Sequence, residues 1–315
     1  MTKLIVLLTC AMITTSIAGI VYADAESSDN PGSKKFQCKT DAGKKSDLAW
    51  PENFGLTADV VGLDSKQSGA AAASSNMQLG LKYDLSGVLF GGSKCKSTLG
   101  PGGIIVPNAI KDGYDDLSGS YVKFAGKGTL TNNADANPES LLEFNLDGGF
   151  AYDVERTNFK LALTSKYEAS QNGDNSQTVF GGSMSLDHIF GQSLNHFMLF
   201  MTVGQVDVKD DAQRKATDPN DTSYNRADAE VVLLQTVNHA RIRDIQISYR
   251  YFKEISPSTL IQDANLDSSH YATYRIGLMS GFYVAYSTGH LPFDQDKDGV
   301  AKVGFQTDID LNFWK

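Results

Sequence analysis

Long apolar runs are scarce in this sequence. Beyond the first 25 residues, no run approaches the roughly 18 residues that a membrane-spanning helix needs. An excess of basic residues is also missing, since the formal net charge is −9 at pH 7. Without a basic face there is no electrostatic case for binding nucleic acid. If the processed chain enters a membrane, it must do so with strands.

Catalytic and cofactor motifs are missing as well. The chain contains no Gly-x-Ser-x-Gly elbow, no His-Glu-x-x-His, no Cys-x-x-Cys and no phosphate-binding loop. Its 5 histidines show no metal-ligand spacing. Asp187 and His188 are neighbours on a predicted strand, so they point to opposite faces and cannot form a direct pair. The sequence therefore predicts neither an enzyme nor a bound cofactor.

One acidic segment resembles part of a metal-binding loop. Asp294, Asp296 and Asp298 alternate as in the first half of a calcium loop, but the twelfth position is Phe305 rather than a bidentate glutamate. The missing ligand favours an acidic surface loop over a metal site. A weak contact with a divalent cation stays as the minor alternative.

The N-terminus indicates export. Lys3 and an uncharged apolar stretch over residues 4–21 precede two small-residue cleavage options, Val21-Tyr22-Ala23 and Ala23-Asp24-Ala25. We predict a signal peptide over residues 1–25. Retention of this stretch as a membrane anchor is the alternative, and the Ala-x-Ala ending favours removal.

A polar leader follows the signal peptide. Residues 26–51 are rich in lysine and show no hydrophobic periodicity, which predicts a mobile segment. Cys38 in this leader and Cys95 are the cysteines that survive processing, and an even pair in an exported chain predicts a disulfide. Two free thiols are the alternative.

From residue 52 to 315 the dominant hydrophobic period is two, as in strands. Val303, Phe305 and Thr307 alternate with Gly304, Gln306 and Asp308, so that one face is apolar and the other polar. Phe197–Met201 and Val231–Leu234 are apolar on both faces, so their register cannot be read. The pattern predicts twelve strands, at roughly 52–64, 76–90, 119–131, 140–153, 156–169, 177–190, 196–209, 228–238, 242–254, 270–279, 281–290 and 301–314.

Three features favour a membrane barrel over a soluble sandwich, which would also alternate. Most strands reach the 9 to 11 or so residues that a tilted spanning strand needs. Short and long connections alternate, apart from the long connection 91–118 on the side of the short ones. Aromatic residues fall at strand ends, as interfacial girdles require, with Phe150, Tyr152, Phe159, Phe190, Phe197 and Phe313 toward one interface and Tyr249, Tyr251, Tyr271, Tyr274 and Tyr286 toward the other.

Over residues 52–315 the chain thus resembles the bacterial outer-membrane β-barrel class. The resemblance rests on the signal peptide, the alternating strands and a terminal amphipathic strand with Phe313 near its end, although Trp314 and Lys315 follow that aromatic. It implies an all-β, antiparallel transmembrane barrel of about 12 strands, in the outer membrane, with short periplasmic turns and longer external loops. Lipid, lipopolysaccharide and the barrel-assembly machinery are the implied partners.

In such a barrel the polar face lines the lumen. We therefore expect a narrow, porin-like channel for small polar solutes, with a structural or surface-interaction barrel of packed lumen as the alternative and a barrel enzyme as a third. The candidate lumen residues carry both signs of charge: Lys82, Asp84, Lys123, Lys127, Glu143, Asp147, Lys160, Lys166, Glu168, Arg250, Arg275, Asp308 and Asp310.

Overall fold

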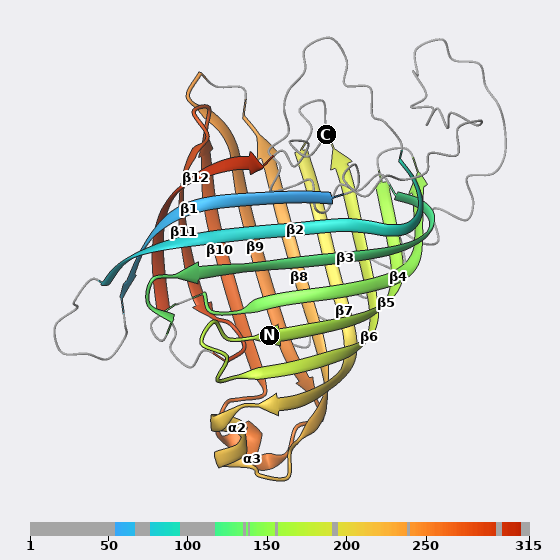
Figure 1. Cartoon of the computed structure of the whole chain (residues 1–315), viewed down its shortest axis with the longest axis vertical. Coiled ribbons are helices and arrows are strands. Elements are labelled where there is room, and N and C mark those ends of the chain that lie inside the picture. Colours follow the sequence, from blue (N-terminus) through green and yellow to red (C-terminus); the bar gives the residue numbers. More distant parts are fainter. Residues whose placement is uncertain are drawn as a thin grey trace. The chain divides into compact units, whose positions relative to one another are not determined.

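The chain folds into one closed antiparallel barrel of twelve strands, in which each strand pairs with its sequence neighbours and β1 pairs with β12 (Figure 1). The computed structural model describes residues 54–66, 76–94, 117–134, 137, 139–154, 157–190, 195–237, 240–293 and 298–309. The predicted fold class and strand number are confirmed.

The strands are long, and most of their bounds lie within a few residues of the predicted ones. They are β1 Phe54–Lys66, β2 Asn76–Lys94, β3 Leu117–Thr131, β4 Leu142–Val154, β5 Thr157–Ala169, β6 Ser176–Phe190, β7 Asn195–Asp210, β8 Ser223–Thr236, β9 Ile242–Ile255, β10 Ser268–Leu278, β11 Phe282–His290 and β12 Asp298–Ile309.

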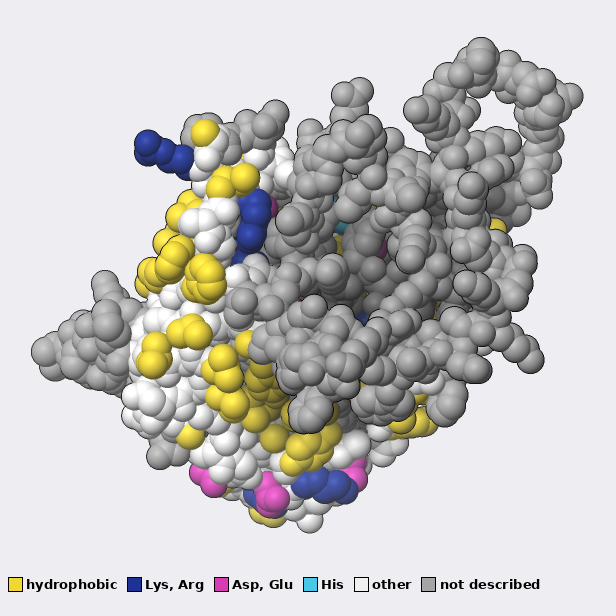
Figure 2. Space-filling view, turned by 45° about the horizontal axis from the view of Figure 1, so that its top comes forward, with side chains coloured by type: hydrophobic (Ala, Val, Ile, Leu, Met, Phe, Trp, Pro, Cys, Tyr) yellow, Lys and Arg dark blue, Asp and Glu magenta, His cyan; other side chains and the backbone are white. Residues whose placement is uncertain are grey.

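The outer face of the wall is apolar. Successive side chains of a strand point to opposite faces, so Leu163 on β5 is 66% exposed while its neighbour Thr164 is 2% exposed. Figure 2 shows hydrophobic side chains grouped over the wall and charged side chains gathered at its lower edge. The inner face is mostly polar, although Val61, Leu63 and Met198 also point inward and are buried. Apolar side chains therefore share the lumen with the charges.

Glycines allow the backbones of β6 and β7 to approach closely. At Gly181 an added Cβ would lie 2.2 Å from the carbonyl oxygen of Val203, and at Gly204 one would lie 2.6 Å from that of Phe180. Both positions lie on the inner face of paired strands. Only a residue without a Cβ lets two backbones approach this closely.

Long and short connections alternate around the barrel, apart from the long connection between the end of β2 at Lys94 and the start of β3 at Leu117. The end that carries the connections β1–β2, β3–β4, β5–β6, β7–β8, β9–β10 and β11–β12 is called the loop end, and the opposite one the turn end. Two short helices at the loop end, α2 Ala212–Thr217 and α3 Thr259–Asp263, lie within segments predicted to be plain loops (Figure 1). Side chains cap both helices, since Asp211 accepts from the Arg214 amide and Ser258 from the Ile261 amide.

One aromatic prediction is wrong. Tyr271 shares a face with Ser269 and Arg275 and is buried, so it points into the lumen rather than toward the membrane interface. Tyr249, Tyr274 and Tyr286 do lie exposed on the outer face.

Several predicted features lie outside the described residues: the signal peptide 1–25, the leader 26–51, Cys38 and Cys95, Asp294, Asp296, Asp310 and Phe313. Asp298 begins β12, and its side chain is not described. Within the described ranges, no helix is long and apolar enough to cross a membrane.

Candidate functional site

One wall of the lumen carries alternating charges on β3, β4 and β5. Lys127 lies 3.5 Å from Glu143, and Lys166 lies 3.5 Å from both Glu143 and Glu168. Glu143 and Glu168 are partners in the β4–β5 register, which places two carboxylates side by side. Such a pair of like charges is stable only when cations surround it.

The opposite wall, on β8 and β9, supplies those cations together with further acids. Arg226 contacts Asp228 at 2.6 Å on its own strand, and Arg250 contacts Glu230 at 3.2 Å. Arg226 and Asp228 differ by two residues, so both side chains face the same way.

Ion pairs join these two walls across the lumen. Arg226 binds Glu168 in a bidentate pair at 2.7 and 2.9 Å, and Arg250 reaches Glu143 at 2.9 Å. Lys127 lies 3.4 Å from Glu230, and Lys166 lies 3.6 Å from Asp228. We call this set the charge network: Lys127, Glu143, Lys166, Glu168, Arg226, Asp228, Glu230 and Arg250.

The network spans the lumen. Four strands separate β4 from β9 along the sheet, and four separate β3 from β8, so contacts below 4 Å between them span the barrel. Glu168 is fully buried and Glu143 nearly so. Gln177 donates to Glu168 at 2.7 Å, and Arg226 and Arg250 both lie over the ring of Phe252. The charges are therefore held in one arrangement rather than left in open water.

The structure brings together part of the predicted lumen set. Five of the predicted residues, Lys127, Glu143, Lys166, Glu168 and Arg250, belong to the charge network. Asp84 faces Lys127 in the β2–β3 register, and Lys123 faces Asp147 in the β3–β4 register. The others lie elsewhere in the barrel. Lys160 is buried on the inner face of β5, Lys82 lies on the inner face of β2, and Arg275 donates to Gln306 at 2.6 Å. Asp308 belongs to β12, and its side chain is not described.

Sequence reasoning missed three network members, namely Arg226, Asp228 and Glu230. We expected β8 to begin at residue 228, and its apolar segment Val231–Leu234 hid the register. Charges at 226, 228 and 230 share the period of two, so extending the strand toward its N-terminus would have found them.

A side chain from outside the strands joins β10 and β12 at the loop end. Glu139 in the β3–β4 connection accepts hydrogen bonds from Lys302 on β12 and Tyr271 on β10, and from the Thr129 hydroxyl at 3.2 Å. Burial raises the pKa of Glu139, but the charges of Lys302 and Lys82 and the hydrogen bonds from Lys302 and Tyr271 outweigh it, so that the pKa falls from 4.5 to about 2. The carboxylate therefore stays ionised and bound.

Apolar side chains pack beside this carboxylate. Leu141 follows it in the connection and is buried with Phe252 on β9 and Tyr271 on β10, together with Leu291 and Phe293 from the β11–β12 connection. We call these five residues the mouth cluster. Through this cluster, the β3–β4 and β11–β12 connections pack against inward-facing side chains of β9 and β10.

A buried polar pair lies near the turn end. His196 on β7, 1% exposed, has its Nδ1 3.2 Å from Asp187 on β6. His188 points to the outer face, where its Nδ1 lies 2.8 Å from the Thr157 hydroxyl. Asp187 and His188 therefore face opposite ways, as expected for neighbours on a strand. Inward Met198, Val232 and Leu234 pack together beside the pair. A mixed polar and apolar group therefore lines this part of the lumen.

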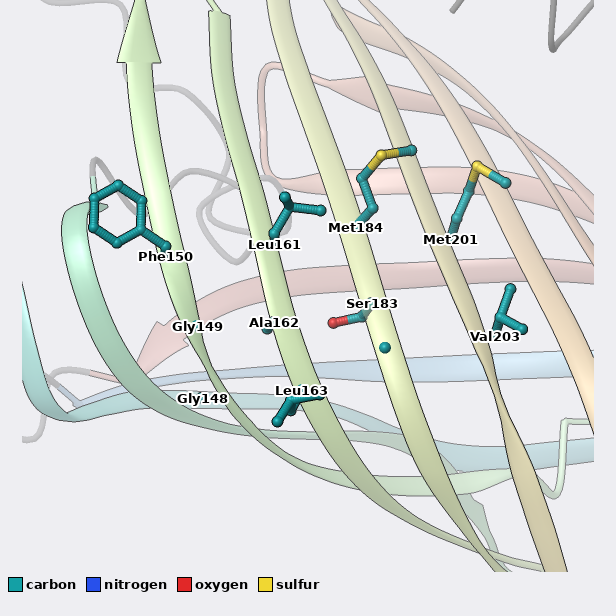
Figure 3. Close-up of a pocket in the computed structure, with 11 residues that line it drawn as sticks. Gly148, Gly149, Phe150, Leu161, Ala162, Leu163, Ser183, Met184, Met201 and Val203 are labelled. Carbon is teal, nitrogen blue, oxygen red and sulfur yellow. The ribbon is translucent and has the colours of Figure 1, made fainter.

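A shallow apolar groove crosses the outer wall over β4 to β7. Gly148 and Gly182 leave it open between larger side chains, including Leu161, Met184 and Val203 (Figure 3). It carries none of the predicted site residues. Within the described part of the chain, no group of three or more His, Cys, Asp or Glu side chains could hold a metal ion.

Comparisons with known proteins find similarity only in structure. No protein-family model and no curated protein matches the chain. Solved structures that match include a BenF-like porin from Pseudomonas fluorescens Pf-5 (9% identity, TM-score 0.33, 82% of this chain and 98% of that chain) and the COG4313 outer membrane channel from Pseudomonas putida F1 (7%, 0.35, 84% and 99%). Outer-membrane expressed OmpT of Vibrio cholerae also matches (9%, 0.36, 81% and 96%). Similarity at this level transfers no substrate and no residue role to this chain.

Proposed function

We propose that this protein is a bacterial outer-membrane barrel that works as a narrow channel for small polar solutes, and that the charge network closes the channel in the state described. The observation that carries the proposal is the set of four ion-paired contacts across the lumen. The apolar outer face supports a place in lipid, and the alternating connections support short turns on the periplasmic side.

The chemistry of the network favours a channel over a merely structural filling. Burying ion pairs costs desolvation energy, and apolar packing of similar volume is often equally stable or more so. Ionisable side chains at membrane depth commonly mark ion and solute pathways. A lumen closed by charges of both signs can also open by exchange of partners, which an apolar core cannot do.

Planar-bilayer recording tests the proposal. Glu143→Gln combined with Glu230→Gln removes two acids and leaves Lys127 and Arg250 without their main partners. We expect a larger conductance than in the wild type and a preference for anions. The matched control is Asp207→Asn, which removes an exposed acid that contacts Lys209 outside the lumen. Its conductance should equal that of the wild type.

The charge network and the mouth cluster at the loop end also favour a second function. In this alternative the lumen is permanently packed, and the external loops bind partners. Absence of conductance in both the wild type and the double variant would support it and defeat the channel. Outer-membrane lipid, lipopolysaccharide and the barrel-assembly machinery are the proposed cellular partners in either case.

A further inference from the structure

A cavity of about 170 Å³ lies at the loop end of the barrel, next to the charge network. This volume is smaller than the roughly 300 to 1,000 Å³ of pockets for drug-sized ligands, so it suits a small solute. Its walls come from α2, the loop-end parts of β8 and β9, and the connections that follow β9 and β11. Its lining includes Arg214, Arg226, Phe252, Glu254, Asp267 and Phe293.

The charged groups of the cavity are held in place before any solute arrives. Arg214 on α2 lies over the ring of Tyr224 at 3.8 Å and contacts Glu254 at 2.5 Å and Asp221 at 2.6 Å. Arg214 and Glu254 are both more than nine-tenths buried. The Nε of Arg214 is also buried and makes no hydrogen bond, so one donor in the wall has no partner.

The signs of the charges indicate the kind of solute. Arg214, Arg226 and Lys253 stand against Asp211, Glu254 and Asp267, so the lining has no net charge. A net anion or cation would upset this balance. A zwitterion would keep the balance, because its carboxylate can meet a guanidinium while its ammonium group meets a carboxylate.

The cavity also has an apolar side. Phe252, Leu291 and Phe293 of the mouth cluster belong to its lining. They would accept a hydrocarbon group attached to the zwitterion and gain free energy from its removal from water.

We propose that this cavity binds a free α-amino acid with an apolar side chain, with the carboxylate toward Arg214, the ammonium group toward Glu254 and the side chain toward Phe252 and Phe293. The inference deepens the proposed channel function, on which it rests, by naming a solute class at the external entrance. Two residues of the cavity lining connect it to the charge network. Arg226 is a member of the network, and the ring of Phe252 lies against Arg226 and Arg250. Occupancy of the cavity therefore bears directly on the contacts that close the lumen.

Isothermal titration calorimetry on the processed, folded chain in detergent tests this binding without any conductance measurement. The probes are L-leucine, glucose and sodium acetate. We expect L-leucine to bind about tenfold or more tightly than either of the others. No binding of leucine, or glucose and leucine binding equally well, would overturn the inference. A channel that conducts but does not bind leucine would leave the proposed function standing and remove only this site.

Variants locate the binding. Arg214→Gln should weaken leucine binding about tenfold or more. Lys215→Gln, which removes a cation on the same helix whose ammonium group is exposed and contacts Asp210, should leave it unchanged. Gln213→Trp should reduce binding by filling the cavity from α2 without removing a charge. Heat-modifiable migration on detergent gels checks that each variant is folded. Full binding in both Arg214→Gln and Gln213→Trp would exclude this cavity.

Discussion

At the residue scale, Glu139 gives a prediction on pH. Its pKa is lower in the folded protein than in the unfolded chain, so its contribution to stability is fully present above about pH 4.5 and is lost as the pH falls toward 2. The shift corresponds to about 3 kcal/mol. We expect hydrogen exchange of residues 139–141, corrected for intrinsic rates, to be equal at pH 7 and pH 5 and to speed up below pH 4. In Glu139→Gln these residues should exchange rapidly at every pH. Equal protection in the variant and the wild type would contradict the role of Glu139.

The close approach of β6 and β7 gives a prediction on stability. Gly181→Ala would place a methyl group against the backbone of Val203, and overpacking of this kind costs about 1 to 3 kcal/mol. Gly148→Ala is the matched control, because nothing lies within 4 Å of a Cβ there. Urea unfolding followed by gel migration should show a lower midpoint for Gly181→Ala alone. A similar loss in both variants would mean that the close approach of the two backbones is not what requires glycine.

For single residues, the alternation in the sequence predicts the direction of a side chain better than its contacts. Alternation placed Lys127, Glu143 and Lys166 on the inner face, and the structure has them there. It could not show that Glu143 meets Arg250, because these residues are 107 positions apart in the chain. Tyr271 was placed at an interface because it is aromatic, although its place in the β10 alternation puts it inside.

At the element scale, the strands were predictable and the helices were not. Twelve segments of period two carry enough repeats to be recognised individually, whereas α2 and α3 span six and five residues and have no apolar stripe to detect. Their capping residues, Asp211 and Ser258, were the available signals. The expected strands at 196–209 and 228–238 leave residues 210–227 as their connection, but the connection in the structure ends at residue 222, because β8 begins at Ser223.

This boundary predicts what can be removed from the loop end. Replacement of residues 212–221 by a short Gly-Ser linker should leave the barrel folded, since the twelve-strand closure does not involve them. A deletion that extends to residue 227 should destabilise it, because it removes Arg226 and leaves Glu168 buried without its bidentate partner. Heat-modifiable migration of both deletion variants checks this difference. Equal stability of the two would show that Arg226 contributes little.

At the scale of the whole molecule, composition and periodicity predicted a barrel but not the state of its lumen. A polar inner face is compatible with an open pore or a packed one, and only contacts between distant strands separate the two. In this protein those contacts exist: Arg250 meets Glu143, and Glu139 reaches across to Lys302. Charge pairs therefore span the lumen, and in the channel that we propose they must change partners for it to open.

Which face of the wall meets lipid can be tested with two adjacent residues of β2, Leu81 on the apolar face and Lys82 on the inner face, both of which are exposed. In a chain whose cysteines are replaced by serine, a single cysteine at position 81 or 82 is labelled with a small fluorophore after folding into vesicles. Lipids brominated on their acyl chains should quench the label at 81 strongly and the label at 82 little. Equal quenching at both positions, or stronger quenching at 82, would contradict the assignment of the apolar face to lipid.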